Sequence, residues 1–547
     1  MPSACIDFRD TNYFSDFICD YLDQKPELDH FYNRFPTLEN FKPQIEEKQL
    51  SYGVSSAVSS SARLPDGQGV ENRRALSQVL TSQYQNLNTS QPTQNNIQSL
   101  TKPNTFTITT GHQLNLFTGP LYFLYKIIST INLTKQLKEA YPDYHFVPVF
   151  WMASEDHDFE EINYFNFKGK KIRWNSEQTG AVGRFSTEGL DAVYEVLSSE
   201  FGNTPHAEQL KTWFKTAYLE HDNLADATRY LANELFGDYG LVVLDADDSE
   251  LKRLFIPQMK RELLENISYK QVSETNTKLE DLDLTIQVNP REINLFYIKD
   301  GLRERIVEVE EKYSVLETEI RWSENELLKE LEAHPERFSP NVIMRPLYQE
   351  VILPNLCYIG GGGEMIYWLQ LKSSFKAQGV TFPILLLRNS VLVKTEKQAK
   401  KQEKLDITNT DLFLKRSSFI NKRVRQISNI DIDFSEQVQH LVKQFEDLYQ
   451  LAEQTDKSFI GAVKAQEVKQ LKGLKHLEKR LLTAQKRKLK DEIERATDLQ
   501  EQLFPGQSLQ ERNLNFSELY LEYGEDLIPN LIKVLEPLDL RFLVLTI

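Results

Sequence analysis

The chain has 547 residues, of which 40% are hydrophobic and 11% aromatic, so it can bury a large core and is not disordered throughout. Its formal net charge of −16 argues against general binding to nucleic acids or anionic membranes. The three cysteines are too few and too scattered for a disulfide framework or a zinc site, and no apolar run is long enough for a membrane helix. We therefore expect a cytoplasmic protein of two or three domains, with no nucleic-acid or membrane partner.

The first 100 residues predict a helical segment followed by a linker. Aromatic residues are interleaved with acids over 1–50, which indicates short helices packed on another body. A Ser-rich loop is expected at 51–64 and a helix at 72–84. Residues 86–104 are rich in Asn, Gln, Thr and Pro, which predicts a flexible surface connection.

Residues 101–400 predict an α/β core with a Rossmann-like parallel sheet. Short β-type runs open the stretches 105–126 and 146–161, and a helical pattern of about twenty residues between them makes a βαβ unit. Each run ends in polar residues, and ligands of open parallel sheets bind at the carboxyl ends of the strands. The expected fold class carries helical insertions, and two inserted segments lie at about 163–235 and 284–340: the first begins with a β-hairpin and continues as helix, and the second is mixed.

The composition changes after residue 400. Leucines and other apolar residues recur at spacings of three, four or seven, with Lys and Glu between them, which predicts a coiled-coil arm over 401–505. The pattern fits either an antiparallel pair within one chain or a pair between chains, and we expect a homodimer formed through this arm. Residues 506–547 are expected to return to the core.

The turn after the first predicted strand is a candidate anion site. It holds Thr110-Gly111-His112-Gln113 and Thr118-Gly119-Pro120, ahead of a helix whose N–H groups and dipole favour a phosphate. His112 would neutralise charge growing on a transferred phosphate, and Gln113 would donate a hydrogen bond. The alternative is an ordinary glycine turn with a solvated histidine, since neither a Walker sequence nor G-x-G-x-x-G is found here.

The second predicted strand ends in a cluster of acids that surrounds one histidine. The cluster is Glu155, Asp156, His157, Asp158, Glu160 and Glu161. If this segment is helical, His157 and Glu161 share one face, as do Asp156 and Glu160. Such a cluster would hold Mg²⁺, orient an amine or act as a base, and the alternative is an acidic helix N-terminus.

A run of four glycines follows a further β-type segment near residue 359. Gly360 to Gly363, followed by Glu364, would allow a ligand to approach the backbone closely, or would form a flexible turn. Arg345 and Arg388 border this segment, where each would clamp a carboxylate or pair with a neighbouring acid. Cys357 lies in an apolar run and is expected in the core.

Four segments together resemble the cysteine-adding enzymes of bacillithiol synthesis (BshC). They are T-G-H-Q-x4-T-G-P-L-Y, V-P-V-F-W-M-A-S-E-D-H-D-F-E-E-I, R-P-L-Y-Q-E-x3-P-N-x2-Y-I-G-G-G-G-E-x2-Y-W-L-Q-L and L-F-P-G-x-S-L-Q-E-R-N. The likeness covers about residues 100 to 520. It implies a Rossmann-type core akin to class I nucleotidyltransferases, a coiled coil, and a ligase that joins the cysteine carboxylate to the amine of glucosaminyl-malate.

A carboxylate does not acylate an amine in water without activation, so ATP or another nucleotide is expected, with Mg²⁺ as a further candidate. Only Gly111-His112 stands for the nucleotidyltransferase His-x-Gly-His, and no Lys-Met-Ser-Lys-Ser loop is found, so the form of activation is left open. Two rival hypotheses are a non-catalytic metabolite-binding scaffold and a metal-dependent hydrolase that uses Asp156, His157 and Asp158.

The predicted site residues fall into two groups. The catalytic candidates are His112, Gln113, Glu155, Asp156, His157 and Asp158. The substrate-binding candidates are Gly111, Thr118, Gly119, Tyr122, Glu161, Arg345, Tyr358, Gly360, Gly361, Gly362, Gly363, Glu364, Arg388 and Asn389. In this hypothesis Glu364 reads the cysteine ammonium, and the acidic cluster accepts the proton of the sugar amine.

Overall fold

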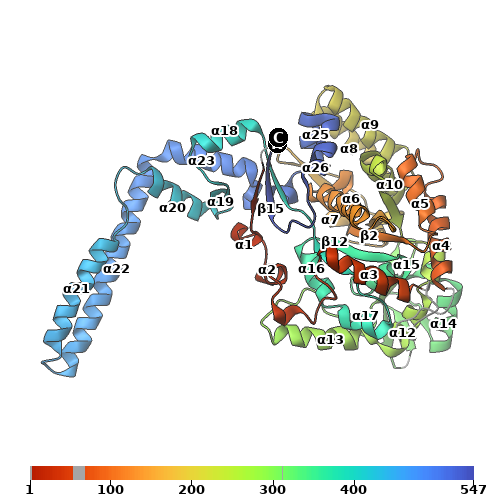
Figure 1. The fold of residues 1–547 in the computed structure, drawn as a ribbon, viewed down its shortest axis with the longest axis horizontal. Helices are drawn as coiled ribbons and strands as arrows, with labels where there is room; N and C mark the ends of the chain where they lie inside the picture. Colours follow the sequence, from red (N-terminus) through yellow and green to blue (C-terminus); the bar gives the residue numbers. More distant parts are fainter. Residues whose placement is uncertain (1–2, 53–67, 311) are drawn as a thin grey trace.

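A computed structural model describes residues 3–52, 68–310 and 312–547 (Figure 1). Residues 53–64 of the expected Ser-rich loop lie outside the described residues. No helix in the described ranges is both long and apolar enough to cross a membrane.

A five-stranded parallel sheet forms the centre of the body, in the order β6-β3-β2-β12-β13. The strands are β2 (Thr105–His112), β3 (His145–Met152), β6 (Val242–Asp245), β12 (Asn355–Gly360) and β13 (Ile384–Leu387). Every residue of β2 and β12 is buried, as expected for strands covered on both faces. In chain order the arrangement is 3-2-1-4-5, which is a Rossmann order and confirms the predicted fold class.

The predicted βαβ unit is present, because α6 (Tyr122–Ala140) connects β2 to β3. Further helices surround the sheet and its insertions (Figure 1). They are α7 (Phe159–Ile162), α11 (Ser249–Arg253), α12 (Ile256–Glu265), α13 (Ile267–Glu280), α15 (Met344–Ile352), α16 (Gly362–Leu369) and α17 (Lys372–Gln378). Cys357 is fully buried in β12, as predicted.

The first insertion matches the prediction. It begins with the hairpin of β4 (Tyr164–Phe167) and β5 (Lys170–Arg173), joined by the two-residue turn Lys168-Gly169, in which both φ angles are positive. Three helices follow, namely α8 (Leu190–Phe201), α9 (Pro205–Leu219) and α10 (Leu224–Phe236).

The second insertion is mixed, as predicted from its residues, but it is mainly sheet and not one of the helical insertions expected of the fold class. It forms an antiparallel sheet in the order β10-β9-β8-β7-β11, together with α14 (Glu324–Ala333). The strands are β7 (Leu295–Lys299), β8 (Leu302–Val309), β9 (Lys312–Val315), β10 (Arg321–Trp322) and β11 (Phe338–Pro340). Asp300-Gly301 joins β7 to β8, and Asp-Gly between apolar runs is a strong hairpin signal.

The N-terminal segment is helical and packs on the core. Its helices are α1 (Phe8–Thr11), α2 (Asp16–Leu22), α3 (Leu38–Ser51), α4 (Gln68–Gln83) and α5 (Gln91–Ser99). Helix α5 replaces the flexible connection expected at 86–104. The Ser90 hydroxyl caps this helix, Pro92 lies in its first turn, and buried Thr93 and Ile97 fix one face, so its polar composition reflects only the solvent side.

The two ends of the chain meet beside the core. Strand β15 (Phe542–Thr546) pairs with β1 (Ser3–Ile6) on one side and with β14 (Val391–Lys394) on the other. The last helices are α24 (Gln510–Asn513), α25 (Phe516–Tyr523) and α26 (Leu527–Val534).

A helical arm projects from the body (Figure 1). Its helices and those at its base are α18 (Glu396–Lys404), α19 (Asn409–Leu412), α20 (Arg416–Ile427), α21 (Ser435–Ala452), α22 (Lys457–Lys488) and α23 (Lys490–Leu503). Helices α21 and α22 pack as a hairpin within one chain around Phe445, Ala452 and Val463, and the Tyr449 hydroxyl donates to Glu467 across it. The antiparallel alternative is therefore the one that this chain adopts.

Candidate active site

The candidate site lies where the chain order of the central sheet reverses, between β2 and β12. The loops that follow two adjacent strands diverge at such a point and leave a crevice at the carboxyl edge of the sheet. A cavity of about 750 Å³ opens there. Fifteen of the predicted residues line it: Gly111, His112, Gln113, Tyr122, Glu155, Asp156, His157, Asp158, Arg345, Tyr358, Gly361, Gly362, Gly363, Glu364 and Arg388.

Five predicted residues lie behind the wall of the cavity and shape it. Asn515 donates to the Gly119 carbonyl, and Thr118 and Gly119 adopt positive φ angles in that turn. Glu161 accepts a hydrogen bond from Gln113 at 2.9 Å. The Gly360 carbonyl accepts from the Arg388 backbone N–H, and Asn389 is bound to Ser129.

His112 is neutral, which corrects its expected role. Its side chain is packed against Tyr122 and Phe123, and the residue is 8% exposed. Burial lowers the pKa of His112 to about 3, and the nearby Lys126 ammonium acts in the same direction. His112 therefore cannot neutralise phosphate charge near pH 7. It can only donate or accept a hydrogen bond, and its Nε2 has no partner among the described residues.

Lys126 fixes the glycine loop through Glu364. The Lys126 ammonium donates to Glu364 at 2.5 Å and to the Gly111 carbonyl at 2.6 Å. Glu364 also accepts from the Gly361 N–H at 2.8 Å and from the Tyr358 hydroxyl at 2.7 Å. Burial would raise the pKa of Glu364, but Lys126 and these donors outweigh it and hold the pKa below its usual range. The Glu364 carboxylate is thus already bound by groups that hold the glycine loop, and the expectation that it binds a substrate ammonium is not supported.

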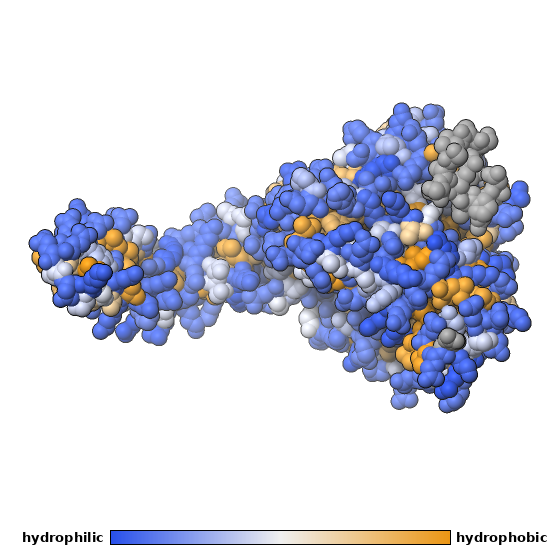
Figure 2. Space-filling view, turned by 90° about the horizontal axis from the view of Figure 1, so that it is seen from below, coloured by the Kyte–Doolittle hydropathy of each residue, from blue (hydrophilic) through white to orange (hydrophobic). Residues whose placement is uncertain are grey.

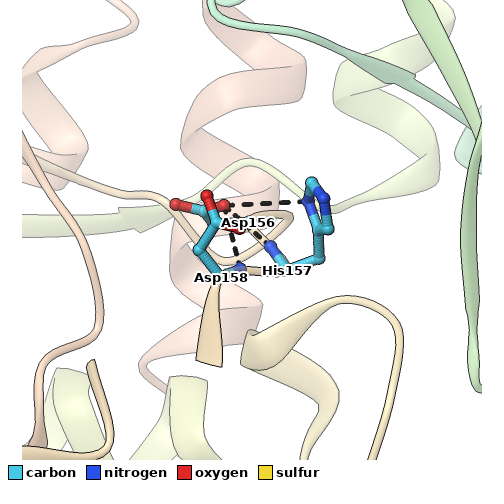
Figure 3. Close-up of side chains that lie close together, drawn as sticks. All are labelled: Asp156, His157 and Asp158. Atoms are coloured by element: carbon cyan, nitrogen blue, oxygen red, sulfur yellow. Dashed lines mark hydrogen bonds and ion pairs between the residues drawn. The ribbon is translucent and has the colours of Figure 1, made fainter. Parts of the chain in front are cut away.

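Residues 156–158 of the acidic cluster are not helical (Figure 3), whereas Glu160 and Glu161 lie in α7. The Asp156 carboxylate accepts the backbone N–H of His157 at 2.7 Å and that of Asp158 at 3.4 Å. A side chain that caps the next backbone groups in this way favours a turn. Helix α7 begins only at Phe159, so the predicted helical pairing of Asp156 with Glu160 is wrong.

Glu155 belongs to a buried chain of charges. The Lys252 ammonium lies 2.5 Å from Glu155, 3.2 Å from Asp247 and 3.2 Å from the Glu336 carbonyl. Arg184 in turn holds Asp247 through two hydrogen bonds. Burial raises the pKa of Glu155 although Lys252 opposes the shift. Lys252 therefore ties the ends of β3 and β6 to the start of the second insertion's last strand.

The second insertion adds arginines to the cavity that were not predicted. Arg303 and Arg305, in β8, line it together with Arg291 and Arg512. Arg303 lies 2.5 Å from His157 Nδ1, and an arginine can only donate, so this nitrogen accepts. The predicted Arg388 instead pairs with buried Glu511 at 2.7 Å.

The comparisons with known proteins agree over the whole chain. Residues 1–389 match the family described as "Bacillithiol biosynthesis BshC, N-terminal Rossmann-like domain", and residues 391–547 match "Bacillithiol biosynthesis BshC, C-terminal coiled-coil domain". Proteins titled "Putative cysteine ligase BshC" include those of Christiangramia forsetii, 60% identical over 100% of this chain and 99% of the relative, and Flavobacterium johnsoniae, 59% identical over 100% of both. The protein of Cytophaga hutchinsonii is 38% identical over 97% of this chain and 96% of its own. The chain belongs to the BshC family.

Proposed function

We propose that this chain is a cytoplasmic cysteine ligase of bacillithiol synthesis, which joins the cysteine carboxylate to the amine of glucosaminyl-malate. The observation that carries the proposal is a single cavity at the switch point of the sheet, lined on one side by the acids after β3 and on another by cationic side chains. The reaction brings an amine, which is cationic when protonated, next to an anionic carboxylate. A site for it therefore needs acidic and basic side chains close to each other. The relatives titled "Putative cysteine ligase BshC" support the cysteine-ligase part of the proposal.

The acids Asp156 and Asp158 would bind the amine and take its proton. Neither lies within ion-pair distance of a lysine or arginine in the described ranges, so both are free to meet a cation. Burial and the neighbouring Asp156 raise the pKa of Asp158, which brings it closer to the working range of a general base. Gln113 donates to Asp156 at 3.0 Å and orients its carboxylate.

The glycine loop fits an anionic group such as a nucleotide phosphate. The N–H groups of Gly362 and Gly363, at the start of α16, have no acceptor among the described residues. The buried Arg388 lies beside the preceding Gly361 and has an Nε without a partner among the described residues. A nucleotide bound here would supply the activation of the cysteine carboxylate, while Lys126 and Glu364 hold the loop in place.

A three-ligand magnesium site fits less well. Asp156, His157 and Asp158 offer ligand atoms within 4.8 Å of one another, but Mg²⁺ prefers oxygen ligands and Arg303 occupies His157 Nδ1. No step of the proposal uses a metal.

The test is to incubate the purified protein with glucosaminyl-malate, cysteine and each nucleoside triphosphate, and to follow the products by mass spectrometry. The proposal expects a product that contains both substrates joined by loss of one water, together with consumption of one nucleotide. Hydrolysis of glucosaminyl-malate without cysteine would favour the metal-dependent hydrolase. Unchanged substrates with every nucleotide, from protein that binds them, would favour the scaffold.

We also propose that the arm forms a homodimer. Apolar residues interrupt its hydrophilic surface (Figure 2). After α21 and α22 pack on each other, Leu451 remains 52% exposed and Leu477 53% exposed. A second copy of the arm packed against this surface would cover these leucines.

A further inference from the structure

Three half-buried arginines in the cavity form no direct ion pair with an acid among the described residues, although the charges of Glu155, Asp156 and Asp158 act on Arg303 from further away. Arg303 and Arg305 come from β8 and Arg345 from α15. The chain carries 80 acids against 64 lysines and arginines, so a lack of acids does not explain this. Guanidinium groups that are partly removed from water without a counter-ion are costly. Their convergence on one cavity indicates that an anionic ligand completes them.

Neutral groups hold two of these guanidinium groups in place. Arg303 donates from Nε to the Ser339 hydroxyl at 3.2 Å and lies 4.1 Å from the centroid of the Phe296 ring. Arg345 donates to the Gln349 side-chain carbonyl at 3.2 Å and to the Tyr367 hydroxyl at 3.1 Å. An arginine has five N–H donors in a fixed fork, so each retains donors that match a carboxylate.

The position of Arg303 favours a ligand that carries a cation next to its anionic group. Arg303 contacts His157, whose neighbours in the chain are Asp156 and Asp158. Any anion at Arg303, phosphate or carboxylate, would place its charge beside these two acids and be repelled unless it brought a cation with it. A ligand that carries an amine next to its anionic group would satisfy both. In glucosaminyl-malate the malate is attached at C1 of the sugar and the amine at the adjacent C2.

We propose that Arg303, Arg305 and Arg345 form an anion anchor for the malate carboxylates of the acceptor substrate. The anchor directs the neighbouring sugar amine to Asp156 and Asp158. The second insertion thus selects the acceptor, because two of the three arginines belong to its sheet. This inference rests on the proposed function, since it names the part of the acceptor that the same cavity reads.

Equilibrium binding of glucosaminyl-malate to the full chain, measured by calorimetry without nucleotide or cysteine, tests the anchor. Arg303→Met and Arg305→Met should each weaken binding by about 10- to 100-fold, the range for losing one charge-assisted contact. The matched control is Arg321→Met, which removes an exposed arginine of β10 in the same sheet and should change binding less than about twofold. Glucosamine, which lacks the malate, should bind wild type and Arg303→Met equally.

Three outcomes would overturn the anchor. Arg303→Met and Arg305→Met could bind glucosaminyl-malate as the wild type does, or Arg303→Met could weaken glucosamine as much as glucosaminyl-malate. Arg303→Met could instead weaken ATP and leave glucosaminyl-malate unchanged, which would make the anchor a phosphate site. Each of these leaves the ligase proposal standing. If folded wild-type protein binds no glucosaminyl-malate, the anchor and the proposed function both fail.

Discussion

Replacing Lys252 by methionine should destabilise the edge of the sheet that carries the cavity. The Lys252 side chain is 1% exposed and neutralises both Glu155 and Asp247. Removing it leaves Glu155 buried without its cation, whereas Arg184 still holds Asp247. Breaking a buried ion pair by removing one partner costs about 3–5 kcal/mol, because the remaining charge stays out of water.

The expected change in thermal midpoint follows from the size of the unfolding unit. The N-terminal family match spans residues 1–389, and an unfolding entropy of about 2.1 cal/mol/K per residue gives about 0.8 kcal/mol/K for such a unit. A loss of about 3–5 kcal/mol then lowers the midpoint by about 4–6 °C, which calorimetry can measure. The control is Lys260→Met in α12, which removes a surface pair with Glu332 and should lower it by about 1 °C or less.

A second substitution separates this reasoning from a simple loss of packing. Adding Glu155→Gln to Lys252→Met removes the unpaired charge, so the double variant should melt above the Lys252→Met single variant. A single variant that melts within 1 °C of wild type would refute the reasoning. So would a double variant whose losses simply add.

Three other predictions use the cavity and the arm. Asp156→Asn should lower the rate of amide formation by about 100-fold or more without moving the thermal midpoint. The control Asp191→Asn, at an exposed position of α8, should change neither quantity. A normal rate of product formation by Asp156→Asn would show that Asp156 is not the base. Unfolded His112 takes up a proton near pH 6.5 and folded His112 near 3, so stability falls as the pH drops through this window. His112→Gln should flatten that part of a midpoint-against-pH curve, and an unchanged slope would show that the ring is not neutral when folded. Leu451→Lys with Leu477→Lys should give a monomer by sedimentation, and a dimer that persists would place the interface elsewhere.

The parallel sheet could be predicted because its strands are short β-type runs that are followed by polar residues or glycine. Buried parallel strands need apolar residues on both faces, and such runs are visible without any partner. The second insertion was predicted as a mixed segment, and its antiparallel sheet was missed although Asp300-Gly301 is a hairpin signal. Arg303, Glu304 and Arg305 follow one another in β8, and this charged run breaks the apolar alternation that identifies a strand.

Sequence patterns identified the cavity residues that lie near the end of a strand of the parallel sheet. They missed the residues that the fold brings to the cavity from distant parts of the chain. Gly111 and His112 are the last two residues of β2, and Asp156 lies four residues after the end of β3. Lys126 could have been found, because a lysine on an otherwise buried stretch of α6 needs an acidic partner. No local sequence pattern identifies Lys252 or Arg303 as part of the site. Lys252 binds groups from three separate segments, and Arg303 contacts His157, which is 146 residues away in the chain.

The pairing of charges distinguishes the frame of the site from the groups that are free to react. Lys126 with Glu364, Lys252 with Glu155 and Arg388 with Glu511 are pairs in which each charge already has its partner. A ligand that binds either residue of such a pair would have to break the ion pair. The free energy lost in doing so would have to be smaller than that gained from the ligand's own contacts. Asp156, Asp158, Arg303 and Arg345 carry no such partner among the described residues, so a ligand meets them without that penalty. Glu364 is a sequence candidate that turned out to be structural in this way, because its partner Lys126 comes from elsewhere in the chain.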